Sequence, residues 1–186
     1  MKYSNNQLEQ LSKSENWQDR EIAARNGFAL EELVNDEDWR VRSAVAEQGF
    51  GLDDLMKDPH WAVRTAVAYQ GHGLETLICD DSVYVRTAVA RKGYKLNILV
   101  NDKAWEVREA VAERGYRLEL LIDDEDEVVR SAAEEALAND GISVDTVRRQ
   151  KKLRKAGKVA GYVGLALIPV TVGVMVCCLN HFSRRK

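Results

Sequence analysis

Six arginines recur 22 residues apart in this 186-residue chain, and five aspartates recur at the same spacing. The arginines are Arg20, Arg42, Arg64, Arg86, Arg108 and Arg130. The aspartates are Asp36, Asp58, Asp80, Asp102 and Asp124. A guanidinium binds a phosphate or a carboxylate through two parallel hydrogen bonds. The spacing therefore has two interpretations, a basic surface for phosphate or acidic peptides and a structural ladder of internal ion pairs.

Charge favours the structural ladder. Residues 1–140 hold 29 Asp and Glu against 17 Lys and Arg, a net charge of −12, so internal partners for the arginines are plentiful. Attraction to phosphate dominates the affinity of nucleic-acid-binding proteins. We therefore expect no nucleic-acid partner for this part of the chain.

The remaining chemistry-bearing residues form no recognisable set. The three histidines, His60, His72 and His181, are scattered, and neither they nor the three cysteines show metal-ligand spacing. The sequence has no glycine-rich phosphate-binding loop. We expect no enzyme, no cofactor and no metal site, and an enzyme without a readable motif remains an alternative.

The arginines must be positioned by the repeats that contain them. We assign a half-repeat cap at 5–16, repeats at 17–38, 39–60, 61–82, 83–104 and 105–126, and a degenerate cap at 127–140. A fixed period of 20–50 residues is typical of solenoids, in which terminal repeats are atypical. Residues 1–140 are therefore expected to form an all-α repeat domain.

Each repeat carries start and stop signals for a helix of about three turns. The aspartates are predicted N-caps, and Pro59 is predicted as a first helical residue. A glycine ends each helix, at Gly27, Gly49, Gly71, Gly93 and Gly115. An L-x-x-L motif then predicts a short second helix, either α or 3₁₀.

Tryptophan recurs at one repeat position, as Trp17, Trp39, Trp61 and Trp105. These side chains could pack between repeats or line an aromatic ligand groove. We favour packing between repeats.

These motifs resemble the leucine-rich repeat variant family, which is related to HEAT-like repeats. The resemblance rests on D-x-x-W-x-V-R-x-A-V-A-x-x-G followed by L-x-x-L, and it covers about residues 5–140. It implies a right-handed α-solenoid in which long and short helices alternate. The 22-residue period is somewhat shorter than the family's usual unit. An iron–sulfur cluster reported with one family member is not carried over, because no cysteine precedes Cys79.

The residues that vary between copies are the candidate partner-binding surface. They lie between the two leucines of each short helix, where the resemblance implies a concave face. The candidates are Asp53, Asp54, Glu75, Thr76, Asn97, Ile98, Glu119 and Leu120. Their character grades from acidic to apolar along the chain, and plain solvation of this face is the alternative.

The C-terminal part changes character. Residues 141–158 form a basic juxtamembrane linker or helix, residues 159–179 run without a charge, and residues 180–186 form a short basic tail. A run of 21 apolar and small residues matches the length of a transmembrane helix. Seven Lys and Arg at 148–158 against three at 180–186 place the repeats in the cytosol by the positive-inside rule. The chain shows no signal peptide, so we expect a tail-anchored, single-pass protein.

Two further groups follow from a membrane-spanning helix. The candidate lipid-headgroup residues are Arg148, Arg149, Lys151, Lys152, Arg154, Lys155 and Lys158. The candidate helix-pairing residues, small and spaced for close approach, are Gly157, Ala160, Gly161 and Gly164. They could support a homo-oligomer.

Two functions remain open at this point. The favoured one is a membrane-tethered scaffold whose cytosolic repeats recruit an unidentified protein partner. The alternative is a membrane-active effector whose transmembrane helix oligomerises under the control of the repeats.

Overall fold

The structure is a computed structural model that describes residues 3–156, and every regular element in that range is an α-helix. The chain divides between Tyr94 and Lys95 into two units. Within each unit, between residues 17 and 139, helices of 9–13 residues alternate with four-residue helices at the predicted period. The predicted unit of a long helix, a glycine turn and a short helix is therefore confirmed.

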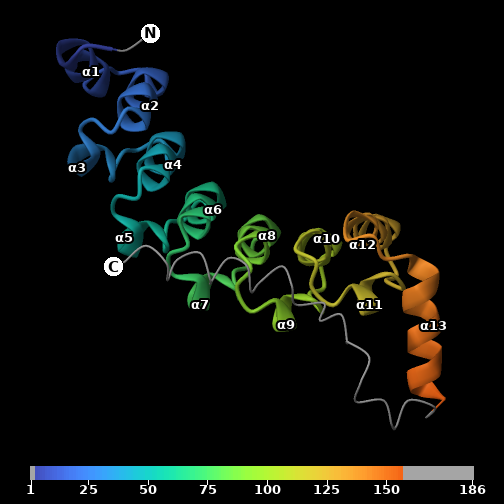
Figure 1. The fold of residues 1–186 in the computed structure, drawn as a ribbon. Coiled ribbons are helices and arrows are strands. Elements are labelled where there is room, and N and C mark those ends of the chain that lie inside the picture. The colour runs from blue at the N-terminus through green and yellow to red at the C-terminus, as the bar shows by residue number, and fades with distance from the viewer. Residues whose placement is uncertain (1–2, 157–186) are drawn as a thin grey trace, which may run out of the picture. The chain divides into compact units, whose positions relative to one another are not determined.

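Residues 3–94, the described part of the first unit, contain eight helices. Four long helices, α2 (Trp17–Arg25), α4 (Trp39–Glu47), α6 (Trp61–Gln70) and α8 (Val83–Arg91), pack side by side in chain order. The short helices α3 (Leu30–Leu33), α5 (Leu52–Leu55) and α7 (Leu74–Leu77) form a second row (Figure 1). Helix α1 (Asn5–Ser12) precedes them and packs on α2.

The described part of the second unit, residues 95–156, contains five helices. Helices α9 (Leu96–Leu99), α10 (Trp105–Glu113) and α11 (Leu118–Leu121) continue the alternation. The longer α12 (Glu127–Asn139) packs on α10, and α13 (Val144–Lys155) packs on α11 (Figure 1).

The core is made of small apolar residues repeated in each long helix. In α6, Val63, Val67 and Ala68 have no exposed surface, and Ala66 is almost fully buried. Small side chains allow neighbouring helices to approach closely on both flanks. The second leucine of each short helix is buried and closes the core from the other side; Leu77, for example, is 2% exposed.

The glycine after each long helix ends it by adopting a left-handed conformation. At Gly27, φ is +72°. The Gly27 N–H donates to the Ala24 carbonyl at 2.8 Å, and the Phe28 N–H donates to the Ala23 carbonyl at 3.0 Å. These two bonds form a Schellman motif, which satisfies carbonyl groups at the end of a helix.

The predicted N-caps are wrong by two residues. The residues that begin the long helices are Asn16, Asp38, His60, Ser82, Ala104 and Asp126. Pro59 lies before the cap His60, so it is not the first helical residue. The repeated aspartates instead accept the N–H of the cap residue, as Asp58 does from His60 at 2.8 Å. They hold the turn that leads into the helix.

No helix among residues 3–156 is long and apolar enough to cross a membrane. The predicted transmembrane helix at 159–179 lies outside the described residues. So do Lys158 and the helix-pairing residues Gly157, Ala160, Gly161 and Gly164.

Candidate functional site

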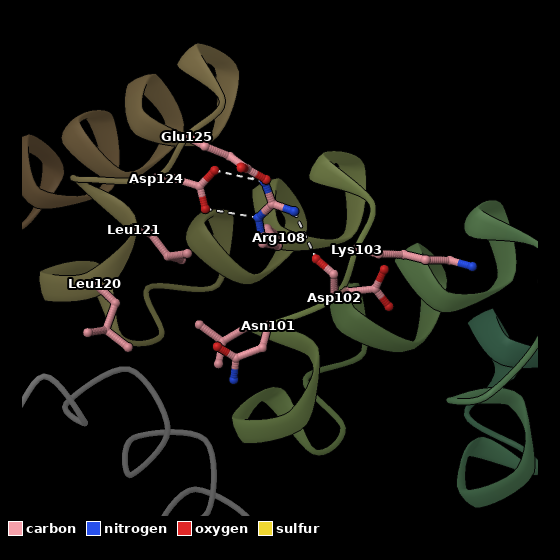
Figure 2. A pocket seen from close by; sticks show the side chains of 9 residues that line it. Asn101, Asp102, Lys103, Arg108, Leu120, Leu121, Asp124 and Glu125 are labelled. Atoms are coloured by element: carbon pink, nitrogen blue, oxygen red, sulfur yellow. Dashed lines mark hydrogen bonds and ion pairs between the residues drawn. The ribbon is translucent and has the colours of Figure 1, made fainter.

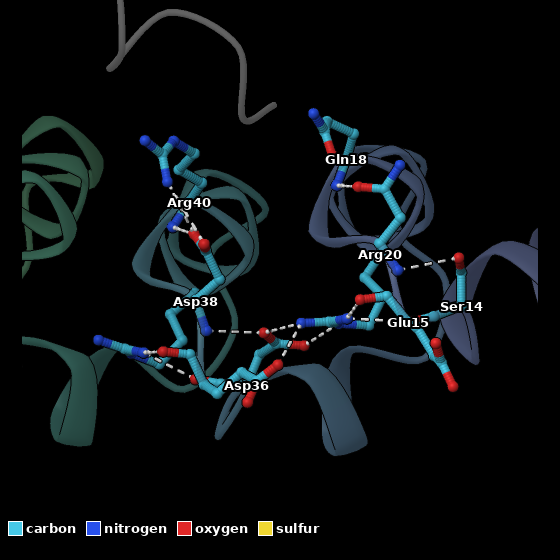
Figure 3. A network of polar contacts seen from close by, with 10 residues as sticks. Ser14, Glu15, Gln18, Arg20, Asp36, Asp38 and Arg40 are labelled. Carbon is cyan, nitrogen blue, oxygen red and sulfur yellow. Dashed lines mark hydrogen bonds and ion pairs between the residues drawn. The ribbon is translucent and has the colours of Figure 1, made fainter.

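The arginine ladder is used internally. Arg20 donates from Nε and Nη2 to the Asp36 carboxylate at 2.6 and 2.9 Å. Its Nη1 donates to the backbone carbonyls of Ser14 and Glu15, both at 2.9 Å (Figure 3). The Arg20 guanidinium therefore joins the turn before its own helix, α2, to the turn before the next long helix, α4.

This arrangement repeats in both units. Arg42 binds Asp58, Arg64 binds Asp80, and Arg108 binds Asp124, each through Nε and Nη2 at 2.6–3.1 Å. In each of these pairs the carboxylate lies 16 residues after the arginine. Arg86 donates to the Asp80 and Asp81 carbonyls, and Arg130 to the Asp124 and Glu125 carbonyls. Asp102 accepts the Ala104 N–H and, through its carbonyl, Arg108.

The ladder side chains are shielded from solvent. In the four pairs, the arginine side chains are 9–18% exposed and the aspartate side chains 4–9% exposed. Burial opposes ionisation of Asp80, but hydrogen bonds from Arg64 and the Ser82 N–H outweigh it, so the pKa of Asp80 is lowered. The pKa of Asp124 is lowered in the same way by Arg108. These donors and acceptors are already satisfied, so the ladder offers little to a ligand.

The candidate partner-binding positions lie on the surface. Asp53, Asp54, Glu75, Thr76, Asn97 and Ile98 are exposed, Leu120 is exposed, and Glu119 is half-buried. In the first unit Asp53 contacts His72 at 2.8 Å, and both line a shallow groove with Asp54. The face is acidic there, with Glu31 and Glu32 also exposed.

In the second unit the corresponding short-helix positions are more apolar. Ile98 is 54% exposed and Leu120 40% exposed. A groove of about 440 Å³ lies between α11 and the segment that follows α9. It is lined by the apolar Val100, Leu120 and Leu121 and by the polar Asn101, Asp102, Lys103, Arg108, Asp124 and Glu125. Figure 2 shows Leu120, Leu121 and Asn101 around the Arg108–Asp124 pair.

The basic segment forms helix α13, in which some cations pair with acidic side chains and others do not. Arg148 and Lys151 contact the Asp123 carboxylate, and Arg148 also lies 3.7 Å from Glu134. The pKa of Asp123 is lowered, mainly by its hydrogen bond from Lys151. The other described cations of α13 are exposed and form no ion pair within residues 3–156; they are Arg149, Lys152, Arg154 and Lys155.

The tryptophans form a surface feature that the sequence did not predict. Trp61 is 41% exposed and Trp105 38% exposed, whereas Trp17 and Trp39 are half-buried. In the first unit, planar side chains stack along the first turns of α2, α4, α6 and α8. We call this set the aromatic stack; in spatial order it contains Trp17, Arg40, Trp39, His60, Trp61 and Tyr84.

The recurrence of tryptophan every 22 residues was the sequence signal for this stack. It did not reveal which side chains lie between the tryptophans. The inserted groups stand at different repeat positions, because His60 precedes Trp61 whereas Arg40 follows Trp39. No periodic pattern therefore marks them.

Among residues 3–156, no group of three or more His, Cys, Asp or Glu side chains could hold a metal ion. Cys79 is exposed and forms no disulfide. No protein-family model and no curated protein matches the chain.

Proposed function

We propose that this chain is a membrane-tethered scaffold for protein–protein interaction. Residues 1–140 would form a right-handed α-solenoid of the leucine-rich repeat variant type, related to HEAT-like repeats. Residues 159–179 would span the membrane, with the repeats on its cytosolic side. The repeats would recruit a protein partner to that membrane without catalysing a reaction.

The observation that carries the proposal is the division of labour within each repeat. The repeated arginines and aspartates satisfy one another, and the repeated valines and alanines fill the core. The middle positions of the short helices vary and are mostly exposed. A surface that changes from copy to copy on a constant frame suits an extended protein partner.

The tether is supported by α13 and the sequence that follows it. Four exposed cations lie within the last seven residues of α13. Cations beside an anionic leaflet contribute about 1 kcal/mol each to membrane attraction. The uncharged run of residues 159–179 begins three residues after α13 and its C-cap.

Photo-crosslinking in cells tests recruitment. A photoreactive residue at position 97 of the full chain should give a discrete adduct in the membrane fraction. Changing both Ile98→Asp and Leu120→Asp should abolish it, because burying an apolar side chain of this size contributes about 1.5–3 kcal/mol. Val128→Asp is the matched control, since Val128 is 43% exposed but lies on α12.

Deleting residues 159–186 should leave the adduct intact but move it to the soluble fraction. An adduct that survives the Ile98 and Leu120 changes would show that this face does not recruit the partner. The absence of any adduct at position 97 would argue against the scaffold itself.

A further inference from the structure

The aromatic stack of the first unit contains two closed intervals between tryptophans. The Arg40 guanidinium lies 4.4 Å from the Trp17 ring centroid and 4.7 Å from that of Trp39. The His60 ring lies 4.1 Å from Trp39 and 5.6 Å from Trp61. Neighbouring helices are typically 8–10 Å apart, so one planar group fills the space between two tryptophans on adjacent helices.

The third interval is open on one side. The Tyr84 ring stacks on Trp61 with centroids 4.5 Å apart. Tyr84 occupies the same repeat position as Arg40, but Val83 stands where Trp39 stands in the earlier repeat. No second tryptophan of that repeat therefore covers Tyr84. At 59% exposure, Tyr84 is the most exposed large apolar side chain among residues 3–156.

The closed intervals indicate which ligand suits the open one. In the first interval a guanidinium lies face-on to aromatic rings, while its Nη1 approaches the Asp38 carboxylate at 3.3 and 3.4 Å. Aromatic rings attract cations through their π-faces, and arginine stacks on them with its planar group.

Charge points to the same ligand. Residues 3–94 hold 16 Asp and Glu against 10 Lys and Arg. Ser82, the cap of α8, makes no side-chain hydrogen bond to the helix, and it replaces the carboxylate that Asp38 supplies to Arg40. An incoming guanidinium would meet the exposed Tyr84 ring on a unit with excess negative charge, and the cation would come from the partner instead of from this chain.

We propose that Tyr84 and Trp61 form a docking site for an arginine side chain of a partner protein. The site extends the aromatic stack by one planar group, as Arg40 does within the chain. It lies on the first turns of the long helices, away from the short-helix positions, and does not depend on the function proposed above.

The test uses the full chain in detergent micelles and a blocked Gly-Arg-Gly peptide. Binding is followed by the NMR shift of the Trp61 indole N–H, which is assigned by its loss in Trp61→Phe. The arginine peptide should give a saturable shift. The same peptide with uncharged citrulline should bind about 2- to 30-fold more weakly, as should the arginine peptide to Tyr84→Ala.

Two variants make the test specific. Tyr69→Ala should bind the arginine peptide like the parent chain, because Tyr69 is 45% exposed on the same unit but lies outside the stack. Val83→Trp should weaken binding, because its indole would cover the free face of Tyr84. Equal binding of the arginine and citrulline peptides would overturn the proposal. So would unchanged binding to Tyr84→Ala, or the absence of a saturable shift.

Discussion

Replacing Arg64 with methionine is the most direct way to test whether the arginine ladder holds adjacent repeats together. The Arg64 guanidinium donates to the Asp80 carboxylate at 2.7 and 2.9 Å and to the carbonyls of Asp58 and Pro59 at 2.8 and 3.2 Å. Methionine keeps much of the side-chain volume but removes all four hydrogen bonds. Asp80 would then be left as a shielded carboxylate without its cation.

The size of the effect follows from burial. Removing one partner of a buried ion pair costs about 3–5 kcal/mol. The Asp80 side chain is 9% exposed and keeps its hydrogen bond from the Ser82 N–H at 2.9 Å. We therefore expect a loss at the lower end of this range, about 3 kcal/mol in the free energy of unfolding.

Arg25→Met is the matched control. Arg25 also reaches the next repeat, where it contacts Glu47 at 2.7 Å, but its side chain is 52% exposed. Exposed ion pairs contribute about 0–1 kcal/mol.

Urea unfolding of residues 1–156, followed by circular dichroism, measures both variants. A loss of 3 kcal/mol corresponds to a fall of about 1–3 M in the urea midpoint. If Arg64→Met costs no more than Arg25→Met, the ladder does not stabilise the repeats and this reasoning is wrong.

Two further predictions concern acid and glycine. The pKa values of Asp80 and Asp124 are lowered in the folded state, so their stabilising contribution is complete above the ordinary aspartate value of about 3.9 and is lost as pH falls through the lower folded-state values. Urea midpoints measured between pH 5 and pH 2 should therefore fall, and they should fall less in Arg64→Met; an equal fall would contradict this assignment. Gly51→Ala should cost about 1–3 kcal/mol more than Gly49→Ala, because a Cβ at Gly51 would meet Val34 Cγ2 at 2.6 Å whereas one at Gly49 meets no atom within 4 Å. Both glycines have positive φ, so backbone strain is common to the two variants, and equal midpoints would show that Val34 moves aside.

The repeat was predictable from sequence because its signals are local and recur five times. Gly27 and its counterparts end helices through their own backbone conformation, and the L-x-x-L spacing defines one face of a short helix. The positions of the N-caps were not predictable in the same way. Asp58 looks like a cap, but its carboxylate is engaged by Arg42, which lies 16 residues earlier and only meets it in the folded chain.

The surface features show the same limit. The sequence shows that tryptophan recurs. The stacking, however, depends on which planar side chain lies between the tryptophans of two neighbouring helices. His60, which precedes Trp61 in the sequence, stacks between Trp39 and Trp61, whereas Arg40, which follows Trp39, lies between Trp17 and Trp39. The choice is made by tertiary packing and leaves no period in the sequence.

Membrane topology tests the central claim most directly. The full chain would be expressed with a glycosylation acceptor fused after Lys186, and protease would be added to sealed membranes from the cytosolic side. The tethered-scaffold account predicts a glycosylated, protected C-terminus and digested repeats. A C-terminus that is unmodified and digested together with the repeats would contradict it.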